Sequence, residues 1–152
     1  MSKLTSADLE AGSIYATFWR MVYMSVHRYD SPSTGELLMV MTIALLHKAG
    51  YDPTILDLVE ITGLNKSNVS RYVSRQIKEG FLTEVVDPQD RRRRRLRSTQ
   101  LGKKDEKWHE SQTLKMAGLT SEALRGLGKS KDPATDLKKI LISINGSSAK
   151  ST

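Results

Sequence analysis

Apolar and polar positions follow helical spacing over most of the chain. Residues 5–29 carry an apolar side chain every three or four positions, and the stretch from about 34 to 49 is apolar on most sides. These patterns predict two helices, the second of them central to a core. Two further helices are predicted, one starting at Asp52-Pro53 with Asp52 as its cap and ending near Thr62, the other over 66–79.

The pattern then changes to that of a β-hairpin. Residues 81–86 are rich in β-branched and apolar side chains, and a turn cluster at 87–90 separates them from 94–98. Two antiparallel strands are predicted, with Arg91–Arg93 near the hairpin tip. We expect Asp87 and Asp90 to fold back and pair with arginines at the hairpin base.

The rest of the chain predicts helices interrupted by glycine. Thr99 can cap a long helix, but Gly126 and Gly128 favour a broken segment over 118–131 with only a short helical piece. A last helix is predicted from Asp132-Pro133 to about Ile144, with Asn145-Gly146 as its stop signal. The final residues, 147–152, are small and polar and predict a disordered tail.

A glycine turn and a polar cap join the third and fourth predicted helices. Gly63 permits a left-handed backbone, and Asn65 can cap the helix that follows. Apolar residues four apart, from Val69 to Ile77, predict the buried side of that helix. The other side has no acid and no large apolar group, and consists of Lys66, Ser67, Asn68, Arg71, Ser74, Arg75 and Lys78. Arg and Lys can donate to guanine and Asn can pair with adenine, so this side suits a DNA major groove.

Charge is the part of the composition that changes this interpretation. The 152 residues carry 24 basic and 17 acidic side chains, for a formal net charge of +7. Residues 64–98 contain ten basic and four acidic groups, so almost all of the excess lies there, and five of the ten are the run Arg91–Arg95. A local positive field suits nucleic acid phosphate. A solvated basic loop is the alternative interpretation of the run.

Other classes of function receive little support from the sequence. The chain has no cysteine, which excludes disulfides and thiolate metal sites. The three histidines, His27, His47 and His109, are too far apart for a local metal motif, and no histidine lies near Ser67, Ser70 or Ser74 in the sequence, so these serines are not expected to be nucleophiles. We therefore expect neither an enzyme nor a metal protein. No apolar run reaches the ~20 residues of a membrane span and no secretory signal is visible, so the cytoplasm is the expected compartment.

Several motifs together resemble those of a known family. They are Gly63–Arg71, Gly80-Phe81-Leu82, Asp87–Arg92 and Ser98–Lys104. With them the chain, from about Leu37 to Lys104, resembles the MarR family of winged helix-turn-helix transcriptional regulators. The resemblance implies a mainly α fold with a small β-hairpin wing, an obligate homodimer and a palindromic operator. It also implies a small aromatic effector, while no cofactor is expected.

We predict four parts of the chain. They are an N-terminal dimerisation helix at 1–34, a winged helix-turn-helix domain at 35–100, C-terminal dimerisation helices at 101–146 and the tail at 147–152. Apolar stripes on the first and last helices favour a dimer independently of the resemblance; their residues are Ile14, Phe18 and Val22, and Leu137, Ile140 and Ile144.

The predicted function is that of a dimeric, sequence-specific regulator of transcription, with repression as the expected effect. The candidate DNA-binding residues are Asn65, Lys66, Ser67, Asn68, Ser70, Arg71, Arg75, Arg91, Arg92, Arg93, Arg94 and Arg95. Two alternatives stay open. One is an architectural DNA-binding protein without sequence preference, and the other is a winged-helix module that docks acidic protein partners.

Overall fold

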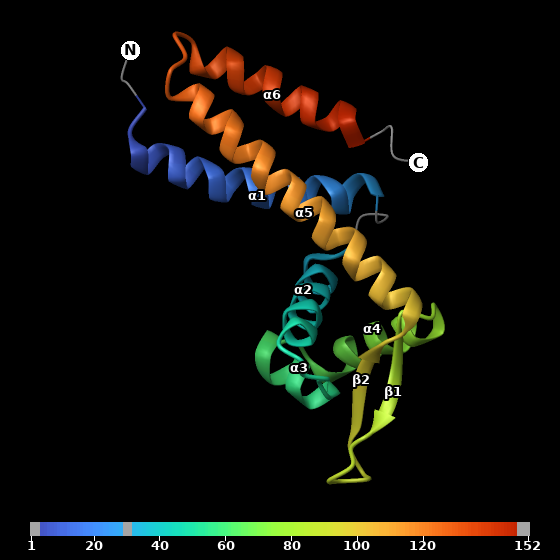
Figure 1. Cartoon of the computed structure of the whole chain (residues 1–152). Helices are drawn as coiled ribbons and strands as arrows, with labels where there is room; N and C mark the ends of the chain where they lie inside the picture. Colours follow the sequence, from blue (N-terminus) through green and yellow to red (C-terminus); the bar gives the residue numbers. More distant parts are fainter. Residues whose placement is uncertain (1–3, 29–31, 149–152) are drawn as a thin grey trace. The chain divides into compact units, whose positions relative to one another are not determined.

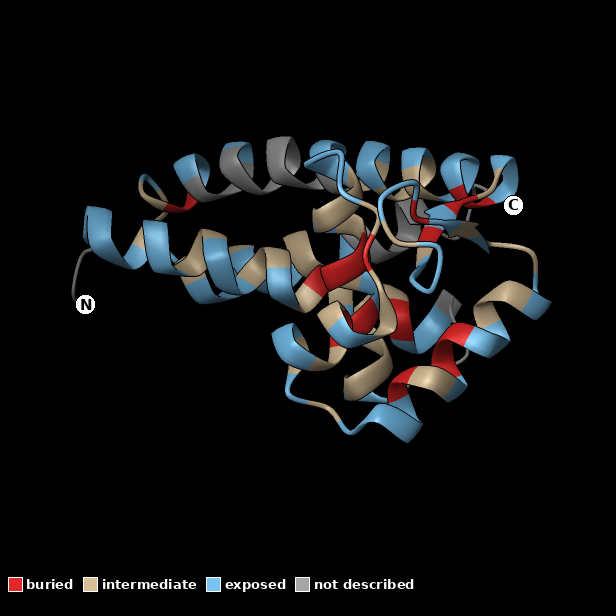
Figure 2. Cartoon of the chain, turned by 90° about the horizontal axis from the view of Figure 1, so that it is seen from below, coloured by how far each residue is buried: buried red, intermediate tan, exposed pale blue. Residues whose placement is uncertain are grey.

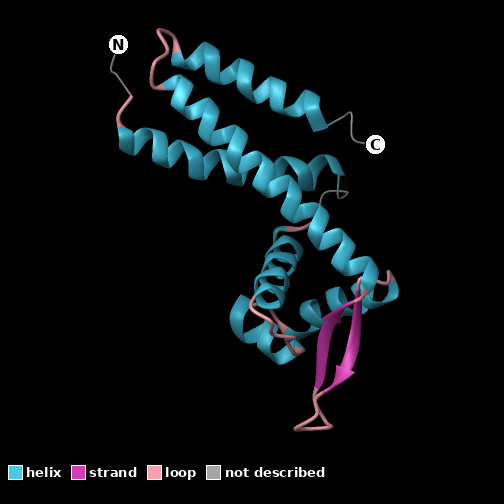
Figure 3. Ribbon diagram, viewed as in Figure 1, coloured by secondary structure: helices cyan, strands magenta, loops and turns pink. Residues whose placement is uncertain are grey.

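The structure, a computed structural model, describes residues 4–28 and 32–148. Over these residues the chain forms helices and one antiparallel two-stranded sheet (Figures 1 and 3). Their order is α1 (Ser6–Arg28), α2 (Thr34–Lys48), α3 (Ile55–Thr62), α4 (Lys66–Lys78), β1 (Leu82–Val86), β2 (Arg94–Ser98), α5 (Gln100–Leu127) and α6 (Pro133–Ser148). The predicted fold class, mainly α with a β-hairpin wing, is confirmed.

The chain divides into two compact units. One unit comprises residues 25–110 and contains α2, α3, α4, the hairpin and the first part of α5. We call it the wing unit. The other comprises residues 1–24 and 111–152 and contains most of α1, the rest of α5 and α6. We call it the helical unit.

A single hydrophobic core holds the wing unit together. Leu58 of α3 is fully buried, and Val69 and Val73 of α4 are 0% and 1% exposed. The other members come from α2, α4 and the hairpin, and are Met39, Ile43, Tyr72, Leu82 and Leu96. Figure 2 draws the buried positions in red. Because Leu82 and Leu96 belong to this cluster, the wing is anchored in the same core as the two helices of the helix-turn-helix.

Reciprocal capping boxes fix where α2 and α3 begin. The Ser33 hydroxyl accepts from the N–H of Glu36 while the Glu36 carboxylate accepts from the N–H of Ser33. Thr54 and Asp57 repeat the arrangement at α3. The prediction that Asp52 caps this helix was wrong, because the capping box satisfies two free N–H groups instead of one.

The turn into α4 agrees with the sequence prediction. Gly63 ends α3 with a φ of 70°, in the left-handed region that glycine adopts without a Cβ clash. Asn65 then caps α4, since its side chain accepts from the N–H of Asn68 at 2.8 Å. The predicted buried positions of α4 are confirmed too, with Ile77 partly buried against the core.

A backbone hydrogen bond joins the outer edge of the hairpin to the body of the wing unit. Leu82 pairs with Ser98 and Val86 with Arg94 across the sheet. On the other edge of β2, the N–H of Leu96 donates to the carbonyl of Pro53 at 2.8 Å. The backbone before α3 therefore adds one hydrogen bond to the outer edge of the wing.

A close approach of backbones fixes the start of α5. Thr99 caps the helix, as predicted, because its hydroxyl accepts from the N–H of Gly102 at 3.0 Å. A Cβ atom placed on Gly102 would lie 2.2 Å from the carbonyl oxygen of Phe81. Only glycine leaves room for this contact, so the first turn of α5 is pressed against the residue that precedes β1.

The helical unit differs from the prediction at two points. The helix α5 continues without a break to Leu127, so the predicted break over 118–131 was wrong as far as Leu127, whereas the chain does leave the helix at Gly128. Similarly, α6 runs past Asn145-Gly146 to Ser148. A glycine inside a helix costs only about 1 kcal/mol, which the rest of the helix outweighs. Residues 149–152 of the predicted tail lie outside the described residues.

Candidate nucleic-acid interface

One side of α4 faces solvent with no acidic side chain. Every residue of the predicted polar face is exposed, namely Lys66, Ser67, Asn68, Arg71, Ser74, Arg75 and Lys78. The opposite side is buried at Val69, Tyr72 and Val73. Burial of that side against the core fixes the rotation of the helix about its axis. The polar face is therefore held outward as a continuous surface.

The first two turns of α4 are ordered by side-chain hydrogen bonds. The Asn65 side chain, besides capping the helix, accepts from the Ser67 hydroxyl at 3.0 Å. One turn on, the guanidinium of Arg71 donates to Oδ1 of Asn68 at 3.0 Å. The Asn68–Arg71 bond leaves the amide NH2 of Asn68 and most of the Arg71 donors available to a ligand.

Arg75 has a partner within the wing unit. Its guanidinium forms an ion pair with the Glu36 carboxylate and lies over the ring of Tyr72, 5.7 Å from the ring centre. This hydrogen bond is the main reason why the pKa of Glu36 lies below its usual value, and it also raises the pKa of Arg75. Arg75 thereby joins α4 to the first turn of α2. Sequence reasoning missed this pair because its members are 39 positions apart.

Arg95 is the centre of a network on the wing, close to the turn of the hairpin. Its Nε donates to the Asp87 carboxylate at 2.9 Å and another guanidinium nitrogen donates to the Asp52 carbonyl at 2.8 Å. The guanidinium also lies 5.2 Å from the ring centre of Tyr51. The N–H of Gln89, followed by Arg95, lowers the pKa of the buried Asp87.

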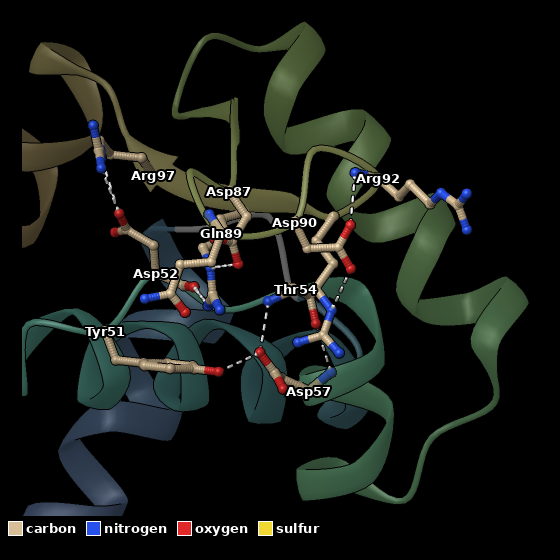
Figure 4. A network of polar contacts seen from close by, with 11 residues as sticks. Tyr51, Asp52, Thr54, Asp57, Asp87, Gln89, Asp90, Arg92 and Arg97 are labelled. Atoms are coloured by element: carbon tan, nitrogen blue, oxygen red, sulfur yellow. Dashed lines mark hydrogen bonds and ion pairs between the residues drawn. The ribbon is translucent and has the colours of Figure 1, made fainter.

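Tyr51 extends this network to α3, and sequence reasoning missed it. Its hydroxyl donates to Asp57 at 2.8 Å, and the same carboxylate accepts from the N–H of Thr54 in the α3 capping box (Figure 4). The start of α3 thus supports the ring on which Arg95 rests. A tyrosine six residues before a helix-capping aspartate carries no local signal of such a role.

Two further arginines of the wing are paired with acids. Arg97 donates to the Asp52 side chain at 2.9 Å, which explains why that carboxylate is not available to cap α3 (Figure 4). Arg93 lies 3.5 Å from the Asp90 carboxylate, which also accepts from the N–H of Arg92. The predicted pairing of Asp87 and Asp90 with wing arginines is confirmed, but the partners lie near the turn of the hairpin and not at its base.

The remaining wing arginines are free in the described part of the chain. Arg91, Arg92 and Arg94 are exposed, and within residues 32–148 no ion pair involves their side chains. Figure 4 shows the guanidinium of Arg92 pointing away from the network below it. The arginine run therefore consists of two groups: Arg93 and Arg95 are paired with acids of the chain, whereas Arg91, Arg92 and Arg94 are exposed and make no ion pair with the described residues.

Other kinds of site are not found in the described residues. In residues 4–28 and 32–148 no three histidine or acidic side chains come together in a way that could hold a metal ion. Over the same ranges no helix has the length and apolar character that crossing a membrane requires. The exposed basic surface is therefore the feature of the wing unit best suited to bind an anionic ligand.

Comparison with known proteins gives the fold a precedent. No protein-family model matches the chain, and no curated protein matches it. Among solved structures, FabT of Streptococcus pneumoniae in complex with DNA has a TM-score of 0.54 at 20% identity, over 91% of this chain and 90% of that one. AdcR, the adhesin competence repressor of Streptococcus pyogenes, has a TM-score of 0.51 at 14% identity, over 90% of this chain and 94% of the other.

The fold and the basic surface define the chain as a winged helix-turn-helix protein. Its fold is shared with FabT and AdcR. Wild-type MarR of E. coli is also similar, with a TM-score of 0.45 at 13% identity over 94% of this chain and 98% of that one. The fold implied by the resemblance in the sequence is confirmed by the likeness to FabT and AdcR.

Proposed function

We propose that the chain is a transcriptional regulator that binds double-stranded DNA with sequence specificity. The observation that carries this proposal is the acid-free face of α4, on which Asn68 and Arg71 are already joined by a hydrogen bond. Such preordering reduces the entropy lost when the side chains bind. The likeness to FabT, which was solved with DNA, supports the proposal through the fold.

In this proposal α4 enters the major groove. Lys66 and Arg71 donate to guanine, and the free NH2 group of Asn68 contributes to base recognition. Asn65, Ser67 and Ser70 lie at the start of the helix, where backbone N–H groups and the helix dipole favour a phosphate. Base contacts then set the sequence preference while phosphate contacts set the position of the protein on the duplex.

The wing contributes through the arginines at its tip. Arg91, Arg92 and Arg94 contact phosphates and an adjacent minor groove, where a narrow groove attracts arginine. Arg75, Arg93 and Arg95 act as positioning residues, because each is paired with an acid of the chain itself. This assignment divides the candidate arginines into those that are paired with an acid of the chain and those that make no ion pair with the described residues.

A homodimer fits the exposed apolar side of α1. Ile14, Phe18 and Val22 are spaced four apart and are 59%, 62% and 49% exposed in the single chain. A second copy would bury this stripe and place two wing units on two half-sites, about 34–36 Å apart or a multiple of that on a palindromic operator. Occupation of a promoter by such a dimer would repress transcription.

A second function is favoured by the unpaired arginines of the wing tip. Three free guanidinium groups in four positions give strong attraction to any duplex, as an architectural DNA-binding protein requires. The two functions differ in how the affinity depends on sequence.

The test is a selection from random duplexes followed by binding measurements at physiological salt. A regulator should bind the selected duplex about a thousandfold or more tightly than a scrambled one. A ratio near one would instead support the architectural function. The absence of duplex binding would contradict both and favour a module that docks acidic proteins.

Two variants assign the contacts within this test. Arg71→Ala should cost about 1–3 kcal/mol on the selected duplex and less on the scrambled one. Replacing Arg91, Arg92 and Arg94 by Ser should weaken binding to both duplexes and reduce the salt slope by about three. Lys129→Ala, which removes an exposed charge from the helical unit, is the control for net charge. An equal loss on both duplexes for Arg71→Ala would make it a phosphate contact.

A further inference from the structure

A histidine that the proposed function does not use joins three elements of the wing unit. His47 lies in the last turn of α2, and its side chain is only 9% exposed. Its Nε2 is 3.0 Å from the carbonyl oxygen of Leu96 in β2. Its Nδ1 is 3.0 Å from Oε1 of Glu106 in α5 and 3.0 Å from the hydroxyl of Ser98.

With Glu106 ionised, the polar atoms around the ring can use two N–H groups. The Ser98 hydroxyl donates its single hydrogen to Glu106 at 2.6 Å. Nδ1 therefore faces two acceptors, the carboxylate and the hydroxyl oxygen, while Nε2 faces a carbonyl that can only accept. A neutral imidazole has one N–H and would leave a lone pair pointing at an acceptor. The doubly protonated ring satisfies all of these contacts.

Charged groups of both signs surround His47. Besides Glu106, the Asp52 carboxylate lies 3.9 Å from Nε2, and the position in the last turn of α2 places the ring at the negative end of that helix dipole. Cations are also near, since Lys48, Lys103, Lys104 and Lys107 line the same groove as His47, together with Glu110. Of the cations beside this cluster, Lys48 is paired with Glu110 and Arg97 with Asp52.

The contact has a clear structural consequence for the wing. The N–H of Leu96 is bound to Pro53 and its carbonyl is bound to His47, so both backbone polar groups of Leu96 are attached to the body of the unit. Leu96 follows Arg95 directly, and Arg94 at the tip is two positions away. His47 thus holds the strand from which the wing tip extends.

We propose that protonated His47 is a positioning residue for the wing, and that loss of its proton releases β2 and weakens binding to DNA. The neutral ring gives up one donor. The Ser98 hydroxyl can then donate its hydrogen either to Nδ1 of the ring or to Glu106, but not to both. When Nδ1 is the nitrogen without a hydrogen, its lone pair faces the Glu106 carboxylate. The contribution of this contact is present at low pH and is lost as pH rises through the range in which histidine deprotonates. The DNA part of the proposal rests on the proposed function.

The direct test is a side-chain NMR titration of the full chain from about pH 5.5 to about pH 8.5, across the histidine range. Long-range proton–nitrogen correlations report which ring nitrogens carry a hydrogen. We expect the His47 ring to hold two protons at the acidic end, and the amides of Arg94 and Leu96 to shift with the same midpoint. A ring with one proton throughout, or amides that do not follow it, would overturn the proposal.

Variants separate this role from ordinary packing. Glu106→Gln keeps an oxygen acceptor but removes the charge, so the shared midpoint should move to lower pH. His109→Gln removes a histidine that pairs with Asp105 and should leave the midpoint unchanged. If His47→Gln fails to fold, the Glu106→Gln titration still decides the matter, because an unchanged midpoint contradicts the proposal.

The functional arm measures affinity for the selected duplex at several pH values. The unaltered chain should lose about fivefold in affinity between about pH 6 and about pH 8, and His47→Gln should remove this dependence. A dependence retained in His47→Gln would contradict the link to DNA binding. If no duplex binds at any pH, the proposed function fails, whereas the NMR titration still tests the histidine contact independently.

Discussion

The wing unit and the helical unit differ in how their exposed apolar side chains are distributed. In the wing unit Leu58, Val69 and Leu96 are at most 1% exposed, and the apolar residues left outside are scattered over several elements. In the helical unit α1 exposes Phe18 and Tyr15 at 62% and 75%, beside one another on the same helix. Scattered exposure is ordinary for a protein surface, but a stripe indicates a missing partner. The wing unit is complete as a fold, while α1 supports the proposed dimer.

The largest expected effect breaks the core of the wing unit. Leu58→Ala should reduce the free energy of unfolding by about 2–5 kcal/mol, because it opens a cavity at a fully buried site. Leu56→Ala is the matched control, since it makes the same change on the same helix at a side chain that is 66% exposed. Denaturant titration of both variants measures the difference. Equal losses would mean that α3 does not bury Leu58 in solution.

The next effect concerns the stripe on α1. Phe18→Ser should weaken self-association by about 2 kcal/mol or more, as a central aromatic residue of an interface does, with little change in helix content. Sedimentation equilibrium and circular dichroism check the two halves of this expectation. Leu45→Ser, at a 69% exposed position of α2, is the control. Equal association constants for the two variants would place the dimer contact elsewhere.

A smaller effect compares the two ends of α5. Gly102→Ala should destabilise the chain by about 1–3 kcal/mol, because the added methyl group clashes with the Phe81 carbonyl. Gly126→Ala adds a methyl group where nothing lies within 4 Å and should stabilise the helix by about 1 kcal/mol or less. Thermal unfolding of both variants checks the signs. Stabilisation by both would show that the start of α5 is not pressed against Phe81.

The smallest effect is the acid sensitivity of the wing unit. The pKa of Glu36 is lowered, first by its hydrogen bond with Arg75, so the folded state holds this proton less tightly than the unfolded state does. The resulting stability is present above the ordinary carboxyl pKa and is lost as pH falls through the lowered value. We expect about 1 kcal/mol or less for this partly exposed pair. Glu36→Gln should flatten the acid limb of the stability curve, and an unchanged limb would contradict this.

Local signals predicted the helix-turn-helix because short-range chemistry determines it. The φ of Gly63, the cap at Asn65 and the spacing of Val69 and Val73 each involve neighbours within a few positions. The hairpin was predictable for the same reason, since its turn and its strands are contiguous. The sequence therefore indicated both parts of the candidate interface before any tertiary contact was known.

Long-range pairing explains what the sequence did not reveal. Arg75 and Arg95 belong to the predicted DNA-binding set, yet both have acidic partners in the fold. Charge patterning cannot distinguish an arginine that meets a phosphate from one that meets a distant carboxylate. The continuous course of α5 was missed because glycine was weighed as a helix breaker, whereas a long helix tolerates it.

The difference between paired and unpaired wing arginines determines which of them can be substituted without loss of the fold. Arg95 and Arg97 hold the hairpin in place, so substitutions there would disturb the fold. Arg91, Arg92 and Arg94 make no ion pairs with the described residues, and replacing them leaves the scaffold intact. Under the proposed function, single substitutions at the wing tip could therefore change the DNA sequence that is bound while the protein still folds.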